Sequence, residues 1–163
     1  MIKKLATGFL AVAATGALAL SLPAAAQAAT AASSAPTSSA DYASYWSATG
    51  KYGLAKAQGW IGVEGEYDHD NTVHVKGRLY DLDNRSYKQG GQCAYVKFQA
   101  GDDEYDWNTV YVKKYCGYPG YKAFHFSEDD VYAMRVKVCQ WNPFDHYTTK
   151  CGKWTYLYDE GEM

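Results

Sequence analysis

The sequence predicts an all-β protein: an antiparallel β-sandwich of about seven strands, immunoglobulin-like in general architecture, with two disulfides. Three observations support this prediction. From Trp60 onward, apolar and polar residues alternate with a period of two. Turn-forming residues separate the alternating runs, and no connection has a helical period long enough for a crossover helix between parallel strands. Four cysteines lie in the same part of the chain. A small closed β-barrel is the alternative architecture.

Residues 1–28 have the pattern of a secretory signal peptide. Lys3 and Lys4 precede an uncharged run from Leu5 to Leu22, and the stretch ends in the small residues Ala26-Gln27-Ala28. The run approaches the length of a membrane-spanning helix, but Thr, Gly and Ser interrupt it and no positive cluster follows. We therefore expect a secreted, extracellular protein whose mature chain begins near Ala29.

Residues 29–58 are expected to form an extension in front of a folded domain of residues 59–163. Ala29 to Ala40 is almost entirely Ala, Ser, Thr and Pro, a composition that predicts a flexible chain because it buries little apolar surface. Asp41 to Gln58 is aromatic but keeps no period of two, so it is either an edge strand or a segment that orders on a partner. For partner binding we adopt the second interpretation, with the anchors Tyr42, Tyr45, Trp46 and Tyr52.

The predicted strands follow in order along the domain. Trp60–Val63 and Val73–Leu79 form a first hairpin, which turns at Asp68-His69-Asp70-Asn71. Ala94–Gln99 and Val110–Cys116 form a second hairpin, which turns at residues 101–104. The remaining three strands are Tyr121–Phe126, Val131–Trp141 and Cys151–Tyr158.

The four cysteines, Cys93, Cys116, Cys139 and Cys151, predict two disulfides in an oxidising compartment. Three pairings are possible for four cysteines. We favour Cys93 with Cys116 and Cys139 with Cys151, because each pair brackets one predicted hairpin. No C-x-x-C knuckle is present and no His adjoins a Cys, so we expect no metal site in place of the disulfides.

The charge balance argues against nucleic acid and anionic membranes as partners. The chain carries 16 basic and 18 acidic residues, and removal of Lys3 and Lys4 with the leader makes the mature chain more acidic still. The only doubled cation after the leader is Lys113-Lys114. Neighbouring side chains of a strand point to opposite faces, so this pair predicts no basic stripe.

The sequence contains no motif that predicts an enzyme or a cofactor. It has no G-x-S-x-G, no H-E-x-x-H and no glycine-rich phosphate loop. Ser86 and Ser127 are the only serines after Trp60, and neither lies in an activating motif. Asp81–Asn84 and Glu128–Asp130 offer oxygen ligands for calcium but complete no EF-hand loop. We interpret both as turns whose side chains accept bonds from backbone amides.

Aromatic residues are the most informative part of the composition, with 16 Tyr and 5 Trp. A core uses few tyrosines, because each phenol must reach a partner or water. If Val110 and Val112 face inward, alternation places Trp107 and Tyr111 on the outer face; Trp154, Tyr156 and Tyr158 predict a second outer row. Such rows either stiffen an exposed sheet or bind a protein or glycan. Trp107 and Tyr111 are therefore candidate partner-binding residues.

Several segments resemble a group of small secreted actinobacterial β-sandwich proteins with two local disulfides. They are Val75–Asp81, Gly91–Val96, Cys116-Gly117, Arg135–Cys139 and Cys151–Trp154. This resemblance implies the fold and export. In size, export and N-terminal extension, the chain is also similar to the adaptor subunits of umbrella toxin particles, which link a lectin subunit to a large repeat-containing toxin protein.

These observations together predict a secreted, non-catalytic protein-binding or adaptor module. The second resemblance implies an extracellular antibacterial toxin assembly as its setting, with another secreted protein as its partner. A glycan-binding module and a secreted protease inhibitor are the alternatives. An inhibitor would present Gly117–Gly120 or Asn142–Asp145 to the cleft of a protease.

Overall fold

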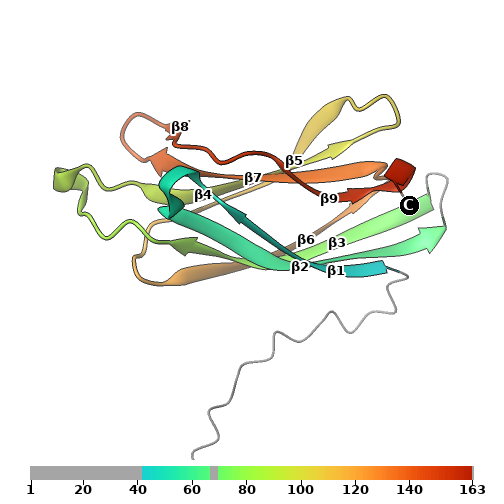
Figure 1. Cartoon of the computed structure of the whole chain (residues 1–163), viewed down its shortest axis with the longest axis horizontal. Coiled ribbons are helices and arrows are strands. Elements are labelled where there is room, and N and C mark those ends of the chain that lie inside the picture. The colour runs from blue at the N-terminus through green and yellow to red at the C-terminus, as the bar shows by residue number, and fades with distance from the viewer. Residues whose placement is uncertain (1–41, 67–69, 163) are drawn as a thin grey trace, which may run out of the picture. The chain divides into compact units, whose positions relative to one another are not determined.

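The computed structural model describes residues 42–66 and 70–162, which form two antiparallel sheets packed face to face (Figure 1). The predicted sandwich is confirmed, and the sheets do not close into a barrel. The predicted signal peptide, its cleavage site and the Ala29 to Ala40 stretch lie outside the described residues and stay predictions.

Sheet A has the strand order β1-β2-β3-β6. Its strands are β1 (Tyr42–Thr49), β2 (Ala55–Glu66), β3 (Asp70–Asp81) and β6 (Tyr121–Asp129). A short 3-10 turn, η1 (Lys51–Gly53), lies between β1 and β2. The first predicted hairpin corresponds to β2 and β3, whose strands extend several residues beyond the predicted bounds at both ends.

Sheet B has the order β5-β4-β7, and both β8 and β9 pair with β7. Its strands are β4 (Cys93–Gly101), β5 (Trp107–Tyr115), β7 (Ala133–Asn142), β8 (Tyr147–Thr149) and β9 (Thr155–Asp159). The other helical segments are the 3-10 turns η2 (Tyr87–Gln89) and η3 (Glu160–Glu162). No helix in the described part of the chain is long and apolar enough to cross a membrane.

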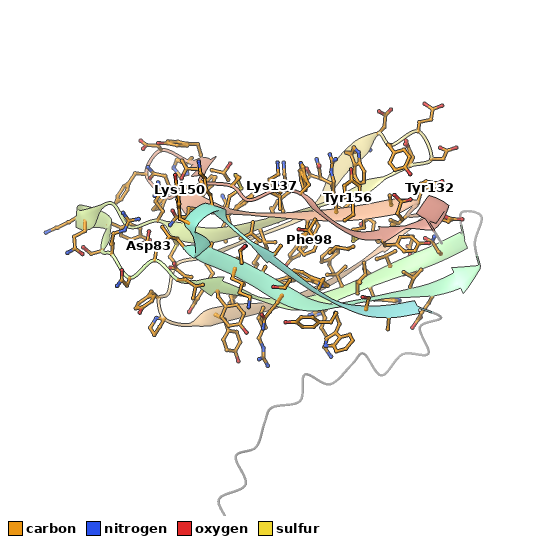
Figure 2. All side chains as sticks on the ribbon, in the orientation of Figure 1. Asp83, Phe98, Tyr132, Lys137, Lys150 and Tyr156 are labelled. Carbon is orange, nitrogen blue, oxygen red and sulfur yellow. A yellow bond between two sulfur atoms is a disulfide. The ribbon has the colours of Figure 1, made fainter. Side chains whose placement is uncertain are left out.

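The core lies between the sheets and consists of the inward-facing residues of both. Phe98 of β4 is at its centre (Figure 2), with its ring centroid 5.5 Å from that of Trp46 and 5.0 Å from that of Phe126. Small and branched residues such as Ile61 and Val136, both fully buried, surround the rings. Each such side chain contributes about 1.5–3 kcal/mol by leaving water.

The described part of the sandwich already includes Tyr42, so the predicted boundary at residue 59 is wrong. β1 pairs with β2 over its whole length, from Tyr42 opposite Val63 to Thr49 opposite Lys56. Only 4% of Trp46 is exposed. Residues 42–58 are therefore part of the folded domain, as an edge strand, a turn and the start of β2.

A row of four residues across sheet A explains why Trp46 is buried. Trp46 lies opposite Gly59, Gly59 opposite Gly77, and Gly77 opposite Phe124. A Cβ atom on Gly77 would come within 2.8 Å of the Phe124 ring and 3.0 Å of the Trp46 ring. Gly77 therefore leaves the space into which the two rings of the outer strands fold, whereas a Cβ atom on Gly59 would meet the backbone of Lys76 and Gly77.

Both disulfides have the predicted pairing, Cys93 with Cys116 and Cys139 with Cys151. Both brace sheet B: one joins β4 to the end of β5, and the other joins β7 to the segment before β9. The closed loops have sequence separations of 23 and 12 residues. Loops of this size stabilise a fold by about 3 kcal/mol each in the chain-entropy model.

Candidate functional site

The structure separates the aromatic residues that were predicted to anchor a partner. Trp46 is in the core and is not accessible to a partner, so its predicted binding role is wrong. Tyr45 lies on the outer face of sheet A, 48% exposed, with its ring edge-on to Trp60 at 5.6 Å. Tyr52 is 72% exposed in the η1 turn. Tyr42 begins β1, and its side chain lies outside the description.

The prediction that Tyr111 faces outward is also wrong, because β5 contains a β-bulge. The register with β4 shifts between Phe98 and Gln99, so that Tyr111 lies opposite Phe98 and Thr109 opposite Gln99. An extra residue in one strand reverses the alternation beyond it. Tyr111 therefore faces the core and stacks on Phe126 at 4.5 Å, whereas Trp107, before the bulge, is on the outer face as predicted.

A second bulge divides the predicted outer row of β9. The register with β7 shifts between Met134 and Arg135, which pair with Tyr158 and Tyr156 respectively. Tyr158 turns inward and is 4% exposed, whereas Tyr156 stays outside and is 55% exposed. The outer face of sheet B therefore keeps part of each predicted aromatic row.

Cations and aromatic rings gather on this outer face, and Figure 2 labels two members, Lys137 and Tyr156, on the side of sheet B away from Phe98. We call it the cation–aromatic face. It comprises Lys97 of β4, Trp107 and Lys114 of β5, Arg135, Lys137 and Trp141 of β7, Trp154, and Tyr156 of β9. Strand pairing brings together residues that are far apart in the sequence.

Each tryptophan of this face has a cation over its ring. The Arg135 guanidinium lies between two of them, 3.8 Å from the ring centre of Trp107 and 4.4 Å from that of Trp154. Its Nε and Nη2 donate hydrogen bonds to Gln99 Oε1 at 3.0 and 2.8 Å. Lys114 Nζ lies 3.3 Å from the ring centre of Trp141. These contacts hold the cations in place on the sheet.

Among the described residues, no side-chain ion pair joins an acidic residue to the positive charges of the face. Lys97 lies directly opposite Lys137 across β4 and β7. Burial and the nearby charges of Lys97 and Arg135 lower the pKa of Lys137. In residues 42–66 and 70–162, side-chain ion pairs join Arg85 to Asp83 and His74 to Glu64, and none involves the face. A concentrated positive surface thus lies on a chain with a net negative charge.

Sequence reasoning missed these cations because it considered only neighbours along the chain. Lys113 and Lys114 do point to opposite faces, as expected. Lys97, Arg135 and Lys137, however, all occupy outward-facing positions of their strands. The detectable signal was the alternation Arg135-Val136-Lys137-Val138 beside Val96-Lys97-Phe98. Only the β4–β7 pairing, which joins segments far apart in sequence, turns these residues into one patch.

The acidic run Asp81–Asn84 forms a structural network. Asp83 is buried, and its carboxylate accepts hydrogen bonds from Arg85 Nε at 2.8 Å, Arg85 Nη2 at 2.7 Å and Gln140 Nε2 at 2.8 Å. The Arg85 guanidinium holds the pKa of Asp83 well below its ordinary value. Burial instead raises the pKa of Asp81. N–H donors thus occupy the Asp83 oxygens, and no cluster of three or more metal-ligating side chains occurs among the described residues.

Three polar residues on the outer face of sheet A stand in the order of a hydrolase triad. Ser127 Oγ lies 2.7 Å from His74 Nδ1, and His74 Nε2 lies 3.4 Å from Glu64 Oε2. Catalysis also requires donors aimed at a developing oxyanion and a site that excludes water. Glu64, His74 and Ser127 lie on the neighbouring strands β2, β3 and β6. The His74 and Glu64 side chains are each about one-third exposed on the outer face of the sheet. We interpret the group as a polar cross-strand network.

Both loops considered for protease inhibition present an exposed aromatic residue, and Tyr118 in Gly117–Gly120 is 52% exposed. Phe144, between β7 and β8, is 71% exposed. Asn142 Oδ1 accepts hydrogen bonds from the backbone N–H groups of Phe144 at 3.0 Å and Asp145 at 3.4 Å, which hold the turn. The Phe144 ring also meets Tyr87 edge-on at 5.4 Å. The Cys139–Cys151 disulfide closes the base of this loop.

Comparison with known proteins gives no relative for this chain: no family model, curated protein or solved structure matches it. The resemblances to secreted actinobacterial sandwiches and to toxin-particle adaptors therefore stay expectations from the sequence.

Proposed function

We propose that this chain is a secreted, non-catalytic binding module that attaches to another secreted protein through the cation–aromatic face. One observation carries the proposal: Trp, Tyr and Arg side chains gather on one sheet face. These residue types dominate the energetics of protein–protein interfaces. Tyr156 (55% exposed) and Val112 (45% exposed) add apolar surface that a partner would cover.

The predicted signal peptide and the two disulfides support an extracellular setting. Both disulfides brace sheet B, so they also hold the proposed surface rigid, and a preorganised surface loses less entropy on binding. The similarity to adaptor subunits of toxin particles favours a multiprotein antibacterial assembly as the setting. A module with one such face would act there as a connector.

Affinity capture tests the proposal. The mature chain from residue 29, carrying a tag, is exposed to culture filtrate of the producing organism beside a Trp107→Ala/Tyr156→Ala variant. The matched control, Tyr45→Ala/Tyr121→Ala, removes two half-exposed tyrosines from the outer face of sheet A. We expect the first variant to lose the captured protein and the control to retain it. Equal capture by all three proteins would contradict the proposal.

The Phe144 loop supports protease inhibition as a second candidate function. An exposed aromatic residue on a braced loop suits the hydrophobic specificity slot of a chymotrypsin-like protease. If the chain is an inhibitor, it slows such a protease and a Phe144→Ala variant does not. An unchanged rate of peptide hydrolysis at micromolar protein would exclude this candidate.

A further inference from the structure

The arrangement of Lys97 and Lys137 lowers the stability of the chain that carries it. The two residues are directly opposite on adjacent strands, and like charges in this position destabilise a sheet. Arg135, next to Lys137 on the same face of β7, adds a third positive charge near the pair. The chain has 18 acidic residues, yet no ion pair of the described residues reaches these cations.

The rings beneath the cations fix their positions. Trp154 lies under Lys137 at 4.2 Å, Arg135 at 4.4 Å and Lys97 at 5.6 Å. Lys114 sits over Trp141, which stacks on Tyr95 at 5.9 Å. Lys97 and Lys137 lie directly opposite each other, and Lys114, which lies opposite Tyr95, is diagonal to Lys97 on β5. The rings of the face hold these three cations, on three neighbouring strands, before any ligand arrives.

Resting on the function proposed above, we propose that the cation–aromatic face recognises an acidic patch on the surface of a secreted protein. Its carboxylates would lie over Lys97, Lys137 and Lys114 and supply the negative charges that no ion pair of the described residues brings to these lysines. Electrostatic complementarity of this kind selects the partner and accelerates association.

The cations over the tryptophan rings favour a protein as the partner over a nucleic acid or a sugar chain. Proteins that bind single-stranded nucleic acid need free aromatic faces on which bases stack, and sugar rings use the same faces. Cations already occupy the faces of Trp107, Trp141 and Trp154.

Titration with poly-L-glutamate tests the inference. The mature chain is titrated at low and at physiological salt, with quenching of tryptophan fluorescence as the signal because three of the 5 Trp lie on the face. We compare Lys97→Gln/Lys137→Gln with the control Lys56→Gln/Lys76→Gln, which removes two lysines from the outer face of sheet A. We expect the first variant to bind about tenfold more weakly, the control to bind normally, and salt to weaken wild-type binding.

Thermal unfolding separates recognition from folding. Because the Gln pair removes like charges that face each other, its unfolding midpoint should equal or exceed that of the wild type. A Lys97→Arg/Lys137→Arg variant keeps both charges and should keep binding. Should the Gln pair unfold early while the Arg pair binds no better, the cations would be structural and the inference would fail.

Two further outcomes would overturn the inference. Tighter binding of polygalacturonate or of an oligothymidylate than of poly-L-glutamate would identify another class of ligand. The captured protein could also bind through Trp107 and Tyr156 while salt and the Lys97→Gln/Lys137→Gln variant leave its binding unchanged. This result would support the proposed function but refute recognition of an acidic patch.

Discussion

Replacing Trp46 with alanine tests whether β1 is part of the sandwich or a segment reserved for a partner. The ring is 4% exposed and lies 5.5 Å from Phe98 and 6.3 Å from Phe124, centroid to centroid. Removal of such a side chain from a core costs about 3–5 kcal/mol. Trp46 Nε1, however, is buried and has no hydrogen-bond partner among the described residues, a cost of about 1–3 kcal/mol that the wild type already bears. We therefore expect a loss near the lower end, about 3 kcal/mol.

A Trp46→Phe variant refines this expectation. It keeps most of the ring contacts and removes the unpaired N–H, so the two effects partly offset each other and the loss should be about 1 kcal/mol. Tyr45→Ala is the control on the same strand, at a position that is 48% exposed, and it should cost less than Trp46→Ala.

Urea unfolding, followed by circular dichroism, measures these free energies in the mature chain. Capture of the partner is measured in parallel under conditions in which each variant is folded. A loss of less than about 1 kcal/mol for Trp46→Ala, well below the range for core truncations, would refute the assignment of β1 to the core. Loss of the partner by the folded Trp46→Phe variant would restore the aromatic segment as an anchor.

Four more outcomes follow from the structure. Gly77→Ala should destabilise the chain by about 1–3 kcal/mol in urea, because the new methyl group meets the Trp46 and Phe124 rings. Asp83→Asn should lower the free energy of unfolding by about 2 kcal/mol at neutral pH. Because the pKa of Asp83 is lowered in the folded state, its stabilising contribution is complete above about pH 4 and is lost as the pH falls further. Below pH 4 the variant should therefore lose less stability than the wild type. Ser127→Ala should leave the unfolding midpoint unchanged, and a fluorophosphonate probe should not label Ser127 in the wild type. Cys139→Ala/Cys151→Ala should lower stability by about 3 kcal/mol, measured by unfolding without reductant.

Local patterns in the sequence predict the hairpins and the disulfides of this fold. In the hairpins β2–β3 and β4–β5, the pairing partners are close along the chain and the turn residues lie between them. Each disulfide closes a short stretch, of 23 or 12 residues, within sheet B. Alternation and spacing therefore contained enough information to place these elements.

The direction of individual side chains required information that alternation lacks. The bulges at Phe98/Gln99 and Met134/Arg135 each insert an extra residue into the partner strand. Tyr111 and Tyr158 therefore point inward, although simple alternation along their strands predicts that they point outward. Packing of the tyrosine rings against the core decides the outcome, and it depends on the opposite sheet.

The sequence left β1 undecided between an edge strand and a partner-binding segment, because its inward face is mostly small. Ser44, Trp46 and Ala48 share that face, and only Trp46 is large. The burial of Trp46 depends on Gly77 of β3, where a Cβ atom would meet the Trp46 ring. The cation–aromatic face escaped prediction for a related reason, because its lysines are separate along the chain and meet only through the β4–β7 and β4–β5 pairings.

Zero-length carbodiimide cross-linking of the captured complex tests the central claim most directly, because the reagent joins a lysine amine only to a carboxylate in contact with it. Peptide mapping then identifies the lysines involved. We predict cross-links from Lys97, Lys114 or Lys137 to Asp or Glu of the partner. Cross-links confined to Lys56 and Lys76 on the outer face of sheet A, with the three lysines of the cation–aromatic face unmodified, would contradict it.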